Sequence, residues 1–308
     1  MTAWKDKLVN GDLLLIDGAM GTELERRGVP MSEKSWSGAA LVEYPEAIVS
    51  VHEDYIRAGA EVITTNTFAV APYVLEDLGM GDRIDATISG AVDLAKRARD
   101  QTGVDVAIAG SIANSAIRNQ DRDPEDRVPA HETMVASARR MAEALAEGGC
   151  DMIALEMMQE DRMAPAALEA ARSFGLPVWL GLSFNWNEAQ DTLVGSAFPD
   201  VTADTVLDAV LPFDPDVVCV MHTDVHVTGA ALEKVRSRWR GPLGAYPNAG
   251  YYAPPNWVFT DSVTPDDLVR ETRGWVDQGA SILGGCCGLG PEHISALRAA
   301  LPFMTPAA

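Results

Sequence analysis

The chain has 308 residues, 47% of them hydrophobic, which is enough to bury a large core in one α/β barrel or in two smaller domains. Its formal net charge of −21 at pH 7 disfavours nucleic acid and anionic lipid as partners, because both carry charge of the same sign. The chain has no signal-like apolar start, no apolar run approaching ~18 residues and only four cysteines, so we expect a cytoplasmic protein with reduced thiols that does not span a membrane.

Eight short apolar runs follow one another along the chain, and helical patterns separate them. Near-continuous apolar runs are typical of parallel strands that are buried on both faces. The helical pattern is clear over residues 132–147, where Met134, Ala138 and Met141 share one face. We therefore expect an α/β protein with a single (β/α)8 TIM barrel as its one domain, residues 1–308. The eight predicted strands are Leu13–Ile16, Glu61–Thr65, Val106–Ala109, Met152–Leu155, Val178–Leu182, Val217–Met221, Pro242–Tyr246 and Ser281–Leu283.

Polar and reactive residues follow the predicted strands at their carboxyl ends, where such barrels carry their working groups. A charged segment, residues 119–127, follows the third strand and is predicted to be either a lid over the barrel mouth or a solvated loop. The candidate site residues are Asp17 and Gly18 after the first strand, Thr67 after the second, Glu156 after the fourth, Ser183 after the fifth, His222 after the sixth, Asn248 after the seventh, and Cys286 and Cys287 after the eighth.

The adjacent cysteines Cys286 and Cys287 lie within the segment Gly284–Gly288. Successive side chains on a regular strand point to opposite faces, so a strand alone would separate the two sulfurs. The flanking glycines allow a turn in which both thiols converge, and two thiolates suit a soft metal such as zinc. The alternatives are a buried pair of small apolar residues or a strained vicinal disulfide, but neither gives the glycines a purpose.

Several segments together resemble the homocysteine S-methyltransferase family, and they occur in the family's order along nearly the whole chain. The resemblance implies a zinc-dependent S-methyltransferase that moves a methyl group from a small onium donor, either a sulfonium like S-methylmethionine or a betaine-like ammonium, to a thiol. Homocysteine is the first acceptor that it implies, with methionine as product. The matching segments are Asp17–Thr22, Thr64–Phe68, Gly110–Ser111, Tyr246–Gly250 and Gly284–Gly288.

The resemblance also implies the metal ligands. The family holds zinc through three cysteines, of which two match Cys286 and Cys287. At the third position this chain has His222, and imidazole is a good zinc ligand. Cys219 is the alternative third ligand, but it lies an odd number of residues from His222 and would point to the other face of a regular strand.

The remaining site residues are expected to contact the substrates. Asp17 and Glu156 match family carboxylates near the amino group of the acceptor, although a structural hydrogen bond at the barrel rim would also explain them. Trp36 is a candidate to hold an onium methyl group by cation–π attraction, with simple packing as the alternative. Further substrate contacts are expected from Gly18, Thr67, Ser183 and Asn248.

Other functions remain open at this point. Met157, Met221 and His222 depart from the family pattern around the site, so another thiol or a selenol is an alternative acceptor. A zinc-dependent hydrolase or lyase, with His222 and Asp224 helping to activate water, is a rival from another enzyme class. A non-catalytic barrel that binds a thiol or stores zinc is a third alternative. The expected partners are a small thiol and a small onium donor, and a homo-oligomer is compatible with the sequence.

Overall fold

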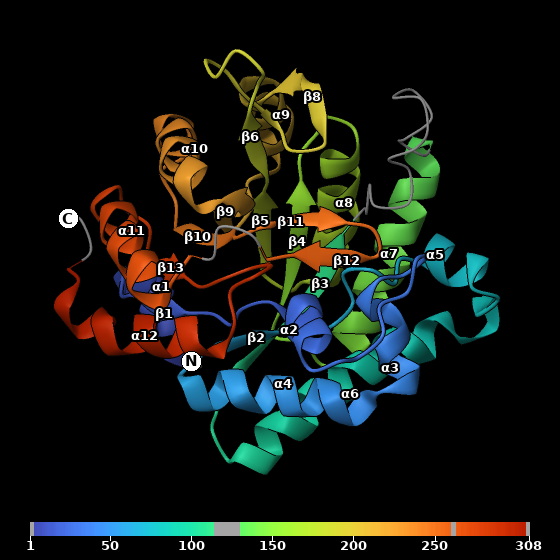
Figure 1. Ribbon diagram of the computed structural model, residues 1–308. Helices are drawn as coiled ribbons and strands as arrows, with labels where there is room; N and C mark the ends of the chain where they lie inside the picture. Colours follow the sequence, from blue (N-terminus) through green and yellow to red (C-terminus); the bar gives the residue numbers. More distant parts are fainter. Residues whose placement is uncertain (1–2, 114–129, 260–262, 306–308) are drawn as a thin grey trace.

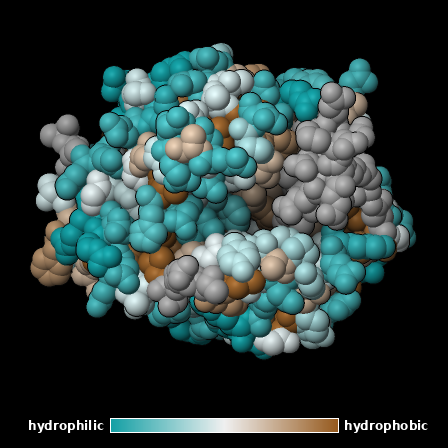
Figure 2. Space-filling view, turned by 45° about the horizontal axis from the view of Figure 1, so that its top comes forward, coloured by the Kyte–Doolittle hydropathy of each residue, from teal (hydrophilic) through white to brown (hydrophobic). Residues whose placement is uncertain are grey.

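The computed structural model describes residues 3–113, 130–259 and 263–305 (Figure 1). The charged segment 119–127, a candidate lid, lies outside these residues. None of the helices in the described ranges combines the length and the hydrophobicity that a membrane crossing requires. The face seen in Figure 2 is largely hydrophilic, with small, separate apolar patches.

Eight parallel strands form the barrel, in the spatial order β1-β13-β10-β9-β5-β4-β3-β2. A parallel bridge between Ile16 and Val62 joins the end of β1 to β2. Each predicted strand overlaps one of these eight strands, so the predicted TIM barrel is confirmed. The strands are β1 (Leu14–Leu15), β2 (Val62–Thr64), β3 (Ala107–Ala113), β4 (Met152–Met158), β5 (Val178–Leu182), β9 (Val217–Asp224), β10 (Leu243–Asn248) and β13 (Ile282–Leu283).

Helices surround the barrel and connect its strands (Figure 1). Local signals mark several of their starts: α4 and α11 carry proline in the first turn, and Thr264 and Asp267 form a capping box at the start of α11. The helices are α1 (Ala3–Asn10), α2 (Met20–Arg26), α3 (Ala40–Glu43), α4 (Pro45–Ala58), α5 (Pro72–Asp77), α6 (Ile84–Thr102), α7 (His131–Glu147), α8 (Met163–Ala171), α9 (Ala203–Val210), α10 (Val225–Arg238), α11 (Pro265–Asp277) and α12 (Pro291–Ala300).

Alternate residues of each strand belong to two apolar layers. In β9, Val218 and Val220 pack in the layer shared with the helices, whereas Cys219 and Met221 pack with Trp179 in the barrel interior. This alternation explains why the strands read as continuous apolar runs, since both faces are buried.

Two small antiparallel sheets, which the sequence did not predict, extend from the barrel. One contains β6 (Phe184–Trp186), β7 (Leu193–Gly195) and β8 (Phe198–Thr202). The other is the hairpin of β11 (Tyr251–Ala253) and β12 (Asn256–Val258), which Figure 1 shows in front of the barrel strands.

Candidate active site

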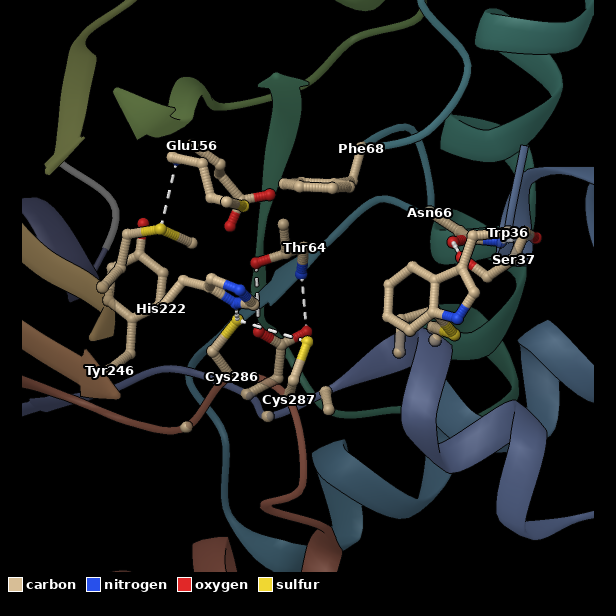
Figure 3. Close-up of a pocket in the computed structure, with 18 of the residues that line it drawn as sticks. Trp36, Ser37, Thr64, Asn66, Phe68, Glu156, His222, Tyr246, Cys286 and Cys287 are labelled. Carbon is tan, nitrogen blue, oxygen red and sulfur yellow. Dashed lines mark hydrogen bonds between the residues drawn. The ribbon is translucent and has the colours of Figure 1, made fainter. Parts of the chain in front are cut away.

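A cavity of about 120 Å³ opens at the carboxyl ends of the barrel strands. Residues from the ends of β1, β2, β4, β9, β10 and β13 line it, and Tyr252 and Trp257 of the β11–β12 hairpin cover one side. Glu156, His222, Cys286 and Cys287 lie on its wall (Figure 3). Asp17 lines it as well. The barrel therefore brings together residues that are up to 270 positions apart in the sequence (Asp17 to Cys287).

Three possible metal ligands meet at this cavity. The Nδ1 atom of His222 lies 3.5 Å from the Sγ of Cys286, and the two cysteine sulfurs lie 3.9 Å apart. The ligand atoms of all three residues lie within 4.8 Å of one another. The Cys287 hydrogen bond and the neighbouring His222 hold the pKa of Cys286 well below its usual range. A close set of two thiols and an imidazole fits a thiophilic metal ion, and zinc is a common choice for such ligands.

The glycines around the cysteines are required by close packing. A Cβ atom at Gly284 would lie 2.3 Å from Cγ1 of Ile16, and one at Gly288 would lie 2.1 Å from the carbonyl oxygen of Ala249. Gly288 also has a φ of 81°, a conformation that favours glycine. The segment therefore turns close to the neighbouring strands, and both sulfurs face the cavity.

His222 reaches the cavity through an irregularity in β9. Met221 pairs with Tyr246, but Asp224 pairs with Asn248, so β9 has one more residue than β10 over this interval. His222 has a φ of 44°, in the left-handed region. The strand alternation is therefore interrupted, and Met221 and His222 both line the cavity.

Cys219 lies deeper in the barrel. It is fully buried in the interior cluster, and burial raises the pKa of its thiol well above the usual value. Among the described residues, the group of possible metal ligands contains His222 and not Cys219. The sequence argument assumed a regular strand, in which Cys219 and His222 point to opposite faces. That assumption is wrong for β9, because the strand is irregular at His222, whose φ is positive.

Two carboxyl groups are buried beside the thiols. Asp17 accepts hydrogen bonds from the Thr64 backbone N–H at 2.7 Å and from the Thr64 hydroxyl at 3.0 Å. Burial nevertheless raises the pKa of Asp17 to about 7. Glu156 accepts a hydrogen bond from the Ser111 hydroxyl, and burial, together with the negative charge of Cys286, raises the pKa of Glu156 to about 8. Such groups favour an incoming cation that pairs with their charged forms.

The other predicted contact residues divide into two sets. Gly18 and Trp36 line the cavity, and a Cβ at Gly18 would lie 2.4 Å from the Leu289 carbonyl oxygen. Thr67, Ser183 and Asn248 are not among the residues that line it. Their roles as substrate contacts stay predictions.

Hydrogen bonds show what these three side chains do in the barrel rim. The Thr67 hydroxyl donates to the carbonyl oxygen of Ser111 at 2.6 Å. The Ser183 hydroxyl donates to the carbonyl oxygen of His222 at 2.9 Å, and Asn248 donates to that of Gly250 at 3.2 Å. Ser183 therefore holds the main chain of the candidate ligand His222.

Asp224, which the hydrolase alternative requires for activating water, is not among the residues that line the cavity. Its side chain is exposed and caps α10 by accepting the His226 backbone N–H at 2.8 Å. His226 is exposed as well. The geometry therefore gives a hydrolase little support at this site.

Sequence reasoning did not single out some residues that line the cavity. The Trp257 ring lies 5.7 Å from the His222 ring, edge to face, and its indole N–H donates to the Ala249 carbonyl oxygen at 2.8 Å. Ser37 was also missed, and it forms hydrogen bonds of 3.1 and 3.0 Å with Asn66, which belongs to the matching segment Thr64–Phe68. The aromatic stretch 251–257 around two prolines is the signal that could have indicated a hairpin over the site.

Comparisons with known proteins match this chain over nearly its whole length. The family model described as homocysteine S-methyltransferase matches residues 14–301. The homocysteine S-methyltransferase of Escherichia coli K12 is 32% identical over 304 residues, which cover 94% of this chain and 95% of that protein. A selenocysteine Se-methyltransferase of Brassica oleracea var. italica is 28% identical, covering 94% of this chain and 88% of that protein. The metallated form of the homocysteine methyltransferase MmuM from E. coli superposes with a TM-score of 0.79 at 28% identity, covering 97% of this chain and 98% of that one.

Proposed function

Because the chain belongs to the homocysteine S-methyltransferase family, we propose that it transfers a methyl group from a small onium donor to the sulfur of a thiol, with homocysteine as first acceptor and methionine as product. The observation that carries this proposal is the meeting of His222, Cys286 and Cys287 at a cavity that also holds two buried carboxyl groups. The first alternative acceptor is a selenol such as selenocysteine, because a selenocysteine methyltransferase is among the relatives.

We propose that the resident metal is zinc, held by His222, Cys286 and Cys287. Bound zinc would keep the acceptor sulfur deprotonated at neutral pH, whereas a free thiol with a pKa of about 8.5 is mostly protonated there. Two thiolates and a neutral imidazole balance the charge of Zn²⁺, so the site starts neutral before an acceptor thiolate arrives.

The carboxyl groups give the acceptor its orientation. Asp17 and Glu156 line the same cavity as the sulfurs, and an amino-acid thiol carries an ammonium group that can pair with them. The bonds from Thr64 hold the Asp17 carboxyl in place, and Ser111 holds that of Glu156. The ammonium would therefore fix the acceptor with its sulfur toward Cys286.

The donor side of the cavity is aromatic. The rings of Trp36 and Tyr252 lie 6.1 Å apart, edge to face, and Phe68 also lines the wall. Among the described residues that line the cavity there is no lysine or arginine, so nothing there opposes a cation. Aromatic faces attract an onium group. As the new S–CH₃ bond forms, the donor's bond to that methyl breaks and its electron pair stays on the leaving sulfur or nitrogen, so a cation enters and a neutral product leaves.

The test is incubation of zinc-loaded protein with methyl-labelled donors and homocysteine, followed by mass spectrometry of the products. We expect labelled methionine, with S-methylmethionine as the better donor and betaine as the weaker one. Selenocysteine in place of homocysteine distinguishes the alternative acceptor. Transfer of the label to water would indicate a hydrolase instead, and a strict requirement for added cobalamin would contradict direct transfer.

A further inference from the structure

Two barrel strands carry a matching irregularity at the cavity. In β4, Leu155 pairs with Leu180 and Met158 with Leu182, so β4 has one more residue than β5 over this interval. The extra residue in β9 lies in the same way beside His222. We call the two segments Glu156–Met157 and Met221–His222 the paired bulges, although Met221 itself still pairs with Tyr246 and the extra residue of β9 follows it. Each contains a non-glycine residue with positive φ, 52° at Met157 and 44° at His222.

Bulges of this kind change the direction of side chains at strand ends, and they need support because positive φ is unfavourable for residues with a Cβ atom. In a regular strand only one of two successive residues faces the barrel interior. Here both members of each bulge line the cavity. Glu156 continues the interior alternation of Met152 and Ala154, as Met221 continues that of Cys219, so the residues that the bulges add to the cavity wall are Met157 and His222.

One side-chain contact joins the two bulges. The Sδ atom of Met221 accepts a hydrogen bond from the backbone N–H of Met157 at 3.2 Å. Strand β5 lies between β4 and β9 in the sheet, so this contact crosses over a whole strand. Met221 thus connects two strands that are not neighbours.

Gly181 of β5 makes this crossing possible. A Cβ atom at Gly181 would lie 2.7 Å from Cγ of Met221 and 2.9 Å from the carbonyl oxygen of Leu155. Any larger residue would push the Met221 side chain away from β4. The glycine and the methionine are therefore complementary, and the flexible, unbranched thioether suits the narrow path.

We propose that Met221 is a positioning residue: its thioether locks the paired bulges together across Gly181 and thereby holds the His222 imidazole toward Cys286. His222 is the next residue in the chain, so a shift of Met221 moves the backbone from which the imidazole projects. The proposal rests on the proposed metal centre, because the position of the imidazole affects metal affinity only if His222 is a ligand. Met221 itself need not touch the metal or the substrates.

The test compares three variants with the wild-type chain. Met221→Leu keeps the size and apolar character but removes the acceptor, and Met221→Gln offers an oxygen to the same N–H. Met152→Leu is the matched control, because Met152 is a fully buried methionine of the same interior cluster at the other end of β4. The measurements are hydrogen exchange of the Met157 amide by NMR, Co²⁺ affinity by competition with a chelator, and the Co²⁺ absorption spectrum.

In Met221→Leu we expect faster exchange at Met157 and a loss of roughly 10–100-fold in Co²⁺ affinity, the range typical of residues that orient a metal ligand. The spectrum should change as well, while Met221→Gln recovers part of the affinity and Met152→Leu matches the wild type. Unchanged affinity in Met221→Leu, or an equal loss in Met221→Leu and Met152→Leu, would overturn the positioning role. A wild-type chain that binds neither Co²⁺ nor Zn²⁺ would refute the metal centre and this role with it, whereas a metal-binding wild type with unaffected variants refutes this role alone.

Discussion

The two halves of the site leave the regular strand geometry by different means. In the glycine half, residues 17–18 and 284–288, close approach is possible because side chains are missing, as at Gly284. In the bulge half, residues 156–157 and 221–222, full side chains are kept and the backbone takes positive φ at Met157 and His222. The first half makes room, and the second turns side chains inward at the expense of backbone strain. The metal group takes ligands from both halves.

The largest effect should come from removing a thiol of the glycine half. Structural zinc sites bind with about 10–16 kcal/mol over four ligands, so we expect Cys286→Ala to lose roughly 3–4 kcal/mol, about 10²–10³-fold in affinity. His222→Ala should lose less, because a neutral ligand is removed. Metal analysis and chelator competition measure both.

Cys219→Ala is the control for these ligand variants, because Cys219 lies in the barrel interior and outside the metal group. It should keep full zinc affinity. If Cys219→Ala loses zinc while His222→Ala keeps it, the third ligand is Cys219 and the bulge half has no part in the metal centre.

The next effect concerns the packing of the glycine half. In Gly284→Ala the new methyl group would lie 2.3 Å from Ile16 and 2.8 Å from the Asp17 carbonyl oxygen, so the backbone must shift. We expect the free energy of unfolding to fall by about 1–3 kcal/mol. Gly90→Ala in α6 is the matched control: no atom lies within 4 Å of its added Cβ, so it should stabilise the protein by about 0.5–1 kcal/mol. Urea unfolding checks both, and equal stability of Gly284→Ala and wild type would remove the steric reason for this glycine.

The two halves differ in how far the sequence predicts them, and the reason is physical. Glycines can be recognised directly in the sequence, so the segment Gly284–Gly288 is enough to indicate a turn and converging thiols. A β-bulge of this kind has no characteristic residue type in the sequence. The extra residue is recognised only when the pairing of the two strands is known. The apolar runs indicate the barrel because both faces of each strand are buried.

The position of Trp257 could not be predicted from the sequence, because it depends on a contact between distant segments. Trp257 lies in the β11–β12 hairpin, and its backbone N–H donates to the carboxylate of Glu25 in α2 at 3.0 Å. These two residues are 232 positions apart in the chain. The stretch 251–257 can indicate a hairpin, but no local pattern indicates that it contacts α2, so the place of this aromatic cover becomes visible only in the folded protein.

The two carboxyl groups predict a pH dependence that differs between the halves. In the folded protein the pKa of Asp17 is about 7 and that of Glu156 about 8, whereas unfolded carboxyls titrate near ~4. The folded state therefore binds more protons, and the free energy of unfolding of the metal-free protein should fall as pH rises from about 4. Each group contributes a slope of up to about 1.4 kcal/mol per pH unit, present to about pH 7 for Asp17 and to about pH 8 for Glu156.

Urea unfolding at several pH values measures this slope. Asp17→Asn should flatten the curve below about pH 7, and Glu156→Gln should flatten it up to about pH 8. Curves for both variants that run parallel to the wild-type curve would show that neither carboxyl has a raised pKa in the folded protein.

The smallest expected effect is a change in the pKa of Asp17 or Glu156 when a hydroxyl that donates a hydrogen bond to it is removed. Asp17 receives two bonds from Thr64, and Thr64→Val removes only the hydroxyl while the backbone N–H bond of 2.7 Å stays. Glu156 receives its bond from the Ser111 hydroxyl, which Ser111→Ala removes. A lost bond to the charged form raises the pKa further, and a net hydrogen bond of about 0.5–1.5 kcal/mol corresponds to roughly one pKa unit or less. Carbon-13 NMR titration of the two side-chain carboxyls should show the smaller rise for Asp17, because its backbone donor, the Thr64 N–H, remains. A larger rise at Asp17 than at Glu156 would mean that the Thr64 hydroxyl, and not the Thr64 backbone N–H, holds the Asp17 carboxylate.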